Sequence, residues 1–238
     1  MRHSLLAALA LVSLLLGGCG AGDKSPTFRT TDITGADFGK DFHLIDHNGQ
    51  PRQLADFRGK AVVVFFGFTH CPDACPTTLA EIAGALKQLG PTADSVQVLM
   101  VTVDPERDTP EILKQYVTAL DPHFLGLTGD AEAIARTAKE FKVFYQKSPG
   151  ANPQTYSVDH SAGTFIFDQA GRLRLYVSYG QGASVFAHDI AELLKQPSRG
   201  EPSTRRREDA KEIRDWFVGD PAIWPHVSFE QCRIIALL

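Results

Sequence analysis

The apolar residues of the chain group into continuous runs that predict strands and periodic stretches that predict helices. Residues 61–68 form an unbroken β-branched and aromatic run, which is typical of a central strand covered on both faces. Apolar residues then recur at helical spacing over residues 76–89. Pro76 suits the first turn of a helix because its missing N–H loses no bond there. We therefore expect a strand, a short loop and a helix, in that order.

Other signals fill the chain between residues 38 and 196. Asn48-Gly49 lies between short apolar stretches, which is a strong hairpin signal. We expect hairpin arms at 41–46 and 53–57. Strands are expected at 96–103, near 142–146, at 163–167 and at 173–179, with a polar loop at 147–159 and a turn at 168–171. Helices are expected at 110–120, with Thr109 as N-cap, at 131–141 and at 185–194. This order predicts an α/β fold, a thioredoxin-like mixed sheet flanked by helices, with an added N-terminal hairpin.

The N-terminus has the pattern of a bacterial signal peptide. Arg2 and His3 precede an uncharged run over residues 5–16. A signal peptide needs about 7 to 15 apolar residues, whereas a membrane-spanning helix needs roughly 20. We therefore assign residues 1–18 to a lipoprotein signal peptide and expect no retained transmembrane helix. Small residues before Cys19 resemble a lipobox, so we expect Cys19 to be a lipid anchor on the periplasmic side of the bacterial cell membrane.

Plain secretion remains an alternative to the lipid anchor, because Gly17 is a less usual residue at its lipobox position. Residues 19–37 are rich in Gly, Ser, Thr and Asp, and we interpret them as a flexible tether to a folded domain at 38–196. Residues 197–238 begin as a linker and end in an apolar extension that contains Cys232. The sequence assigns no role to this extension.

Composition and charge narrow the class of partner. The chain has 238 residues, of which 43% are hydrophobic and 22% charged, so it can bury one substantial core. Its formal net charge is −4. Nucleic-acid recognition usually requires a basic face, and we therefore expect no nucleic acid as a partner.

Two cysteines carry the chemistry expected of the domain. Cys71 and Cys75 lie on the loop between the strand at 61–68 and the helix that follows it. Ligands and catalytic groups often gather at this edge of an α/β sheet. A helix start also favours thiolate over thiol, so we expect both sulfurs to be reactive.

The spacing of the two cysteines leaves three interpretations open. A structural disulfide is one, although such bridges usually close longer loops. A redox-active pair and a pair of metal ligands are the others, because three intervening residues let both sulfurs meet each other or one ion. The spacing alone does not choose among them.

His160 is the candidate third ligand. It precedes the strand at 163–167, so its imidazole could project toward the same sheet edge as Cys71 and Cys75. Two sulfurs and an imidazole suit copper, whereas a closed zinc site normally has a fourth ligand. Asp159 could orient the ring, although an exposed carboxylate is equally compatible with the sequence.

The remaining histidines have weaker patterns. His70 adjoins Cys71, but we expect it to point away from the sulfurs. We give the segment 104–110 a structural role, shaping the loop beside this edge and capping a helix. A packed or solvated role is expected for His43, His47, His123, His188 and His226.

Three segments of the chain resemble the Sco/SenC family: residues 67–76 (GFTHCPDACP), 103–110 (VDPERDTP) and 158–161 (VDHS). The resemblance extends from about residue 35 to 196. It implies a thioredoxin-like fold and copper bound by Cys71, Cys75 and His160. It also implies a role in assembling the dinuclear copper centre of cytochrome c oxidase, with the copper-bearing subunit and other periplasmic copper or thiol-redox proteins as partners.

Two function classes follow from these residues. The first is a copper metallochaperone that holds the ion and passes it to a partner. The second is a copper-independent thiol-disulfide oxidoreductase, in which Cys71 and Cys75 are the catalytic pair and His160 is dispensable. A peroxidase ranks below both, because the segment before Cys71 lacks the Pro and Thr pattern of such sites.

Overall fold

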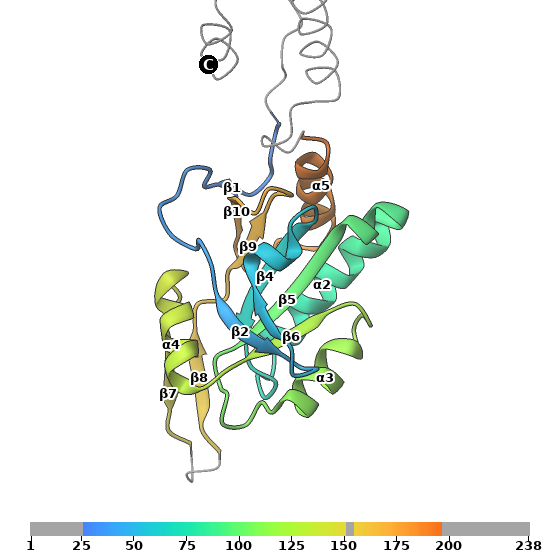
Figure 1. Ribbon diagram of the computed structural model, residues 1–238. Helices are drawn as coiled ribbons and strands as arrows, with labels where there is room; N and C mark the ends of the chain where they lie inside the picture. Colours follow the sequence, from blue (N-terminus) through green and yellow to red (C-terminus); the bar gives the residue numbers. More distant parts are fainter. Residues whose placement is uncertain (1–25, 151–154, 197–238) are drawn as a thin grey trace, which may run out of the picture.

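An eight-stranded mixed sheet forms the centre of the protein in a computed structural model (Figure 1). The structure describes residues 26–150 and 155–196. The strand order is β1-β10-β9-β4-β5-β6-β2-β3. The strands are β1 (Thr31–Asp32), β2 (His43–Asp46), β3 (Pro51–Gln53), β4 (Ala61–Gly67), β5 (Val96–Thr102), β6 (Leu125–Thr128), β9 (Thr164–Phe167) and β10 (Leu173–Val177).

Helices cover both faces of this sheet. α2, α3 and α5 lie on one side, and α4 lies on the other (Figure 1). The helices are α2 (Ala74–Leu89), α3 (Pro110–Thr118), α4 (Ala131–Glu140) and α5 (Ala183–Leu194), with 3-10 turns η1 (Leu54–Phe57) and η2 (Gly90–Ser95). The predicted α/β fold, a mixed sheet flanked by helices, is confirmed.

The central strand is β4, as the apolar run predicts. All seven of its residues are buried. It pairs in parallel with β5 and antiparallel with β9, so neither edge of the strand is free. The C-terminal end of β4 and the loop after Gly67 therefore lie at the sheet edge where we expect the cysteine site.

The helix after β4 begins two residues earlier than predicted. Helix α2 starts at Ala74 and not at Pro76, so Cys75 lies within its first turn. Pro76 still occupies a position whose N–H has no partner inside the helix. Asp73 precedes the helix, and its backbone carbonyl accepts a hydrogen bond from the Thr77 N–H at 3.1 Å.

The N-terminal hairpin is confirmed, with a shorter second arm. Strands β2 and β3 pair antiparallel, and β2 also pairs with β6, which adds the hairpin to one end of the sheet. Asp46 stabilises the turn, because its carboxylate accepts the N–H groups of Asn48 and Gln50 at 2.8 and 3.0 Å. Gly49 has φ +79°, which glycine adopts without strain. Of the predicted second arm at 53–57, only Gln53 lies in β3, because residues 54–57 form η1.

The second half of the predicted tether is ordered against the domain, so the expectation of a flexible segment up to residue 37 is wrong. Strand β1 pairs antiparallel with β10. The buried Asp189 carboxylate accepts the N–H groups of Arg29 and Thr30, both at 2.9 Å. The sequence did not predict this start, because a two-residue polar strand has no pattern of its own.

The predicted polar loop over 147–159 is wrong at both ends. Its ends form β7 (Tyr145–Ser148) and β8 (Ser157–His160), an antiparallel pair separate from the main sheet. Most residues of these strands are partly or fully exposed, so they lack the apolar alternation that predicts a strand. Strand β6 was likewise missed. The proposed signal peptide, Cys19, and the extension at 197–238 lie outside the described residues.

Candidate metal centre

Cys71 and Cys75 lie at the end of β4, one on the loop and one in the first turn of α2. Both thiols are free. Cys75 is fully buried, whereas Cys71 is half-buried. The Cys75 backbone N–H donates to Cys71 Sγ at 3.5 Å, so the helix start stabilises the sulfur of Cys71. Cys71 is therefore the member of the pair that solvent or a partner can reach.

The expectation that both sulfurs favour the thiolate is wrong for Cys75. Burial raises the pKa of the Cys75 thiol far above its ordinary value, and the neighbouring Cys71 sulfur adds to this rise. A backbone hydrogen bond with Phe68 opposes the shift but does not cancel it. Desolvation penalises a buried thiolate more than one helix start stabilises it. Burial of Cys75 therefore favours the thiol over the thiolate.

His160 ends β8 and meets the cysteines from the other side. Its Nε2 lies 3.6 Å from Cys75 Sγ. Its Nδ1 lies 3.0 Å from the carbonyl oxygen of Ser161, which only accepts, so Nδ1 carries the proton in this contact. The lone pair of Nε2 is thereby directed to the sulfurs. The rings of Phe65 and Phe68 face the imidazole edge-on.

Asp159 does not orient the imidazole. Its carboxylate accepts a hydrogen bond from the Ser148 hydroxyl, across the β7–β8 pair. Successive residues of a strand point to opposite faces, so Asp159 and His160 face apart. The Ser161 carbonyl has the role that we expected of Asp159.

The structure brings the three predicted ligands together. The two sulfurs and the imidazole nitrogen all lie within 4.8 Å of one another. Bonds from a metal to sulfur and to imidazole nitrogen are about 2.3 and 2.0 Å long, so ligands of one ion stand up to about 4.6 Å apart. The arrangement is thus within a small side-chain movement of a three-ligand metal site.

His70 lies outside this group, as expected. Its Nδ1 lies 3.1 Å from the Thr69 hydroxyl, and about half of the side chain is exposed. His47 is packed, since its Nδ1 accepts the Gly126 N–H at 3.1 Å. The other described histidines lie beside carboxylates: His43 by Asp41, His123 by Asp121 and His188 by Asp189. His226 lies outside the described residues.

The segment at 104–110 has the structural role that we predicted. The buried carboxylate of Asp108 accepts the Thr69 hydroxyl at 2.6 Å, the Thr69 N–H at 3.0 Å and the Thr102 hydroxyl at 2.7 Å. These bonds fix the loop that leads to Cys71. Thr109 caps α3, because its hydroxyl accepts the Ile112 N–H.

Sequence reasoning missed two tyrosines near the site. The Tyr116 hydroxyl is buried and has no hydrogen-bond partner among the described residues. Burial raises the pKa of Tyr116, and the sulfurs of Cys75 and Cys71 add to this. Tyr156 lies in the segment that we expected to be a polar loop, and its hydroxyl donates to Asp104 at 2.7 Å. The sequence predicted a helix over the segment that contains Tyr116, but it gave no sign that this side chain lies near the cysteines.

Comparison with known proteins assigns the chain to a family. The protein-family model described as SCO1/SenC matches residues 30–195 of the chain. The chain belongs to the SCO1/SenC family.

The relatives of this SCO1/SenC protein include proteins with solved structures. The SCO2 homolog of Bos taurus mitochondria is 42% identical over 165 residues, which cover 68% of this chain and 62% of the relative. The copper-bound structure of Bradyrhizobium japonicum ScoI is 38% identical, with a TM-score of 0.60, and covers 66% of this chain and 99% of that one. The apo Sco1 structure from Thermus thermophilus is 42% identical, with a TM-score of 0.65, and covers 72% and 99%.

These neighbours confirm the thioredoxin-like fold. The chain spans about 62% of the length of the bovine relative that it matches. Among the described residues, no helix has the length and apolar character needed to cross a membrane.

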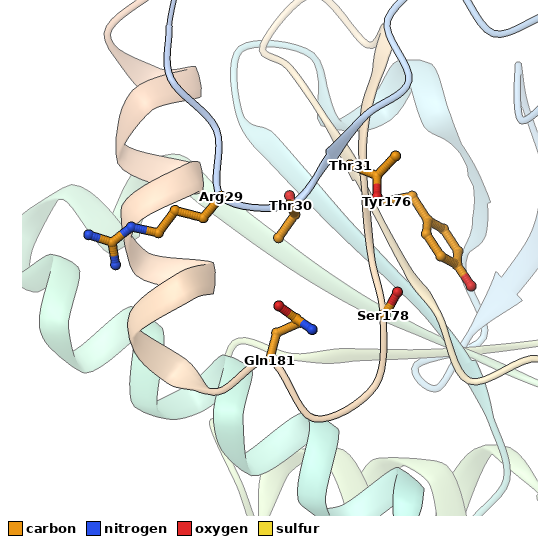
Figure 2. A pocket seen from close by; sticks show the side chains of 6 residues that line it. All are labelled: Arg29, Thr30, Thr31, Tyr176, Ser178 and Gln181. Atoms are coloured by element: carbon orange, nitrogen blue, oxygen red, sulfur yellow. The ribbon is translucent and has the colours of Figure 1, made fainter.

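A second feature of this SCO1/SenC protein is a polar cavity of about 240 Å³ beside β1 and β10 (Figure 2). The Gln181 amide and the hydroxyl groups of Thr30 and Ser178 lie near one another here, whereas the Arg29 guanidinium points away from them (Figure 2). The lining residues are Arg29, Thr30, Thr31, Tyr176, Ser178 and Gln181. None of the three candidate metal ligands lines it.

Proposed function

We propose that this protein is a copper metallochaperone that binds one copper ion through Cys71, Cys75 and His160. Its recipient is the dinuclear copper centre of cytochrome c oxidase, on that enzyme's copper-bearing subunit. One observation carries the proposal: three donor atoms, from segments 85 residues apart, lie within 4.8 Å of one another. The copper-bound structure of Bradyrhizobium japonicum ScoI supports it.

The donor set favours copper over the other common metals. Thiolate sulfur is a soft ligand and, with imidazole, suits copper. A structural zinc site is usually closed by four protein ligands, and only three of the described residues form this group. Metal binding replaces the thiol protons, so loading releases protons to solvent.

The same geometry suits delivery of the ion. Cys71 is half-buried, so an incoming sulfur can bond to the metal from that side while Cys75 and His160 still hold it. Each new bond forms before an old one breaks, and the oxidation state of copper is unchanged. A three-ligand site leaves room for this exchange.

The test is a copper titration of the reduced, purified chain without oxygen. We expect one copper ion per chain in the wild type and loss of tight binding in Cys71→Ser, Cys75→Ser and His160→Ala. His70→Ala is the matched control, because this neighbouring imidazole lies outside the ligand group. Full copper retention in His160→Ala would remove His160 from the ligand set.

A thiol-disulfide reductase is the second candidate. Both thiols are free, and the Cys75 N–H lies 3.5 Å from Cys71 Sγ. In this reaction the Cys71 sulfur attacks a partner disulfide, which forms a mixed disulfide and releases one partner thiol. Cys75 then attacks the Cys71 sulfur and releases the second partner thiol, so the pair ends as a disulfide. Unchanged reductase activity in His160→Ala, together with no copper uptake by the wild type, would favour this function.

The location in the proposal is the periplasmic side of the bacterial membrane, with Cys19 as a lipid anchor. The small residues before Cys19 support this assignment. Cells that produce the wild type or Cys19→Ser, fed with labelled palmitate, test it. Label in the wild type alone is expected, and an unlabelled wild type would reject the anchor.

A further inference from the structure

A cluster formed by Asp104, Arg107 and Tyr156, here named the clasp, joins the turn after β5 to the segment that enters β8. The Tyr156 hydroxyl donates to the Asp104 carboxylate at 2.7 Å. Arg107 Nη1 donates to the Tyr156 carbonyl at 2.9 Å, and Arg107 Nε donates to Asp104. The guanidinium carbon lies 3.7 Å from the centre of the Tyr156 ring. Three different interactions therefore hold Tyr156 to one turn.

The β7–β8 pair needs such a contact because the main sheet does not include it. Strand β8 pairs only with β7 among the described strands. An isolated two-stranded hairpin is marginally stable. His160 is the last residue of β8, so the position of its imidazole depends on side-chain contacts that fix this hairpin to the domain.

A path of packed side chains leads from the clasp to the imidazole. The Arg107 guanidinium lies 5.8 Å from the centre of the Phe68 ring. The Phe68 ring in turn lies 5.8 Å from the His160 ring, at an interplanar angle of 85°. The clasp therefore approaches His160 through Phe68 as well as along β8.

The turn that carries the clasp also fixes the cysteine loop. Asp104 and Asp108 are both fully buried, and the Asp108 N–H donates to the Asp104 carbonyl at 3.0 Å. Asp108 binds Thr69, two residues before Cys71. The same turn therefore contacts both the loop that carries the sulfur ligands and the segment that leads to the nitrogen ligand.

We infer that Arg107 and Tyr156 are positioning residues for metal binding, which hold His160 at the distance from Cys71 and Cys75 that one copper ion requires. This inference rests on the proposed function. Neither residue belongs to the ligand group. Without the clasp, β8 moves relative to the turn and the site has two sulfurs with no fixed nitrogen.

The test compares four variants of the full chain. Tyr156→Phe removes only the hydroxyl bond to Asp104, Arg107→Gln removes the cation, and Arg107→Lys keeps the charge. Lys147→Met is the control: Lys147 also lies over the Tyr156 ring, 4.7 Å from its centre, but it pairs with the exposed Glu106 outside the clasp.

Three measurements are made on each variant: copper affinity by chelator competition, the electron paramagnetic resonance spectrum of bound Cu(II), and hydrogen exchange of the β8 amides in metal-free protein. We expect Tyr156→Phe and Arg107→Gln to lower the affinity roughly 10- to 100-fold, the size of loss known for residues outside the ligand set that orient metal ligands. Their nitrogen hyperfine signal should weaken and β8 should exchange faster. Arg107→Lys should recover part of the affinity, and Lys147→Met should match the wild type.

A core variant distinguishes positioning from general stability. Ile134→Val shortens a buried side chain on α4. If Tyr156→Phe and Arg107→Gln change affinity and spectrum no more than Ile134→Val does at an equal loss of Tm, the inference is overturned. If the wild type binds no copper, the proposed function fails, and with it the role in metal binding. Hydrogen exchange of β8 then tests the structural part of the inference, that the clasp holds β8: faster exchange in the clasp variants supports it, and unchanged exchange overturns it.

Discussion

Nε2 of His160 lies 3.6 Å from Sγ of Cys75, although 85 residues separate the two in the chain. The sulfur is fixed by the first turn of α2, and the imidazole by a hairpin outside the main sheet. Their contact therefore depends on how the start of α2 and the β7–β8 hairpin are held relative to each other.

The absence of a side chain at Gly67 makes room for Cys75. A Cβ at this position would lie 2.8 Å from Cys75 Sγ and 2.7 Å from Cε1 of Phe65. Gly67→Ala should therefore destabilise the fold by about 1–3 kcal/mol, as overpacking usually does, and displace the sulfur. We expect weaker copper binding in the same variant, measured by chelator competition.

Gly126→Ala is the matched control for that experiment. Its Cβ would lie 2.9 Å from Leu113 Cβ, so it overpacks the core between β6 and α3 and leaves the sulfurs untouched. We expect a loss of Tm with copper affinity retained. Equal affinity in Gly67→Ala and Gly126→Ala would contradict the tight packing around Cys75.

Thr69 should support the cysteine loop through Asp108. Thr69→Val removes the hydroxyl that donates to the Asp108 carboxylate at 2.6 Å and leaves that buried oxygen without this partner. We expect a cost of about 1–3 kcal/mol in denaturant unfolding. Thr77→Val is the control, since its hydroxyl makes only an exposed 3.4 Å contact with Asp73, and it should change stability little.

The docking of the N-terminal segment on α5 should make stability depend on pH. Burial alone would raise the pKa of the Asp189 carboxyl, but hydrogen bonds from Thr30, His188 and Arg29 outweigh it and hold the pKa below its ordinary value. A lowered pKa stabilises the fold above the unfolded-state value, near pH 4, and this stabilisation is lost as pH falls through the folded-state value.

Asp189→Asn tests this dependence. At pH 7 we expect it to cost about 1–3 kcal/mol, because hydrogen bonds to a charged group are lost. The difference from the wild type should shrink as pH falls below about 4. Denaturant unfolding from pH 3 to 7 measures it, with Glu132→Gln on the surface of α4 as the exposed control. A difference that does not change with pH would contradict the role assigned to this carboxylate.

The parts of the fold that the sequence predicted are those whose own residues determine the element. Strand β4 is apolar at every position, and the β9–β10 turn follows from its residues, with Gly171 at φ +74°. Strand β7 overlaps the strand predicted near 142–146 at residues 145 and 146. Strands β1 and β8 were not predicted, and they form because partners elsewhere in the chain pair with them. Their polar residues have no period that local reasoning could detect.

The site was predictable to a similar degree. Spacing alone indicated that Cys71 and Cys75 act together, but three interpretations stayed open. The position of His160 before a strand made it a candidate third ligand, and the family resemblance implied the full ligand set. The prediction that Cys75 favours the thiolate was wrong, because burial raises the pKa of this thiol. The burial results from the packing of α2, which the spacing of the cysteines does not reveal. Tyr156 was missed because its partners Asp104 and Arg107 lie about 50 residues away.

The central claim is that two sulfurs and one imidazole nitrogen share a copper ion. X-ray absorption of the copper-loaded chain measures these bonds directly. We predict two sulfurs at about 2.3 Å and one nitrogen at about 2.0 Å, with the nitrogen lost in His160→Ala and kept in His70→Ala. A spectrum with no nitrogen at that distance in the wild type, or one unchanged by His160→Ala, would contradict the account.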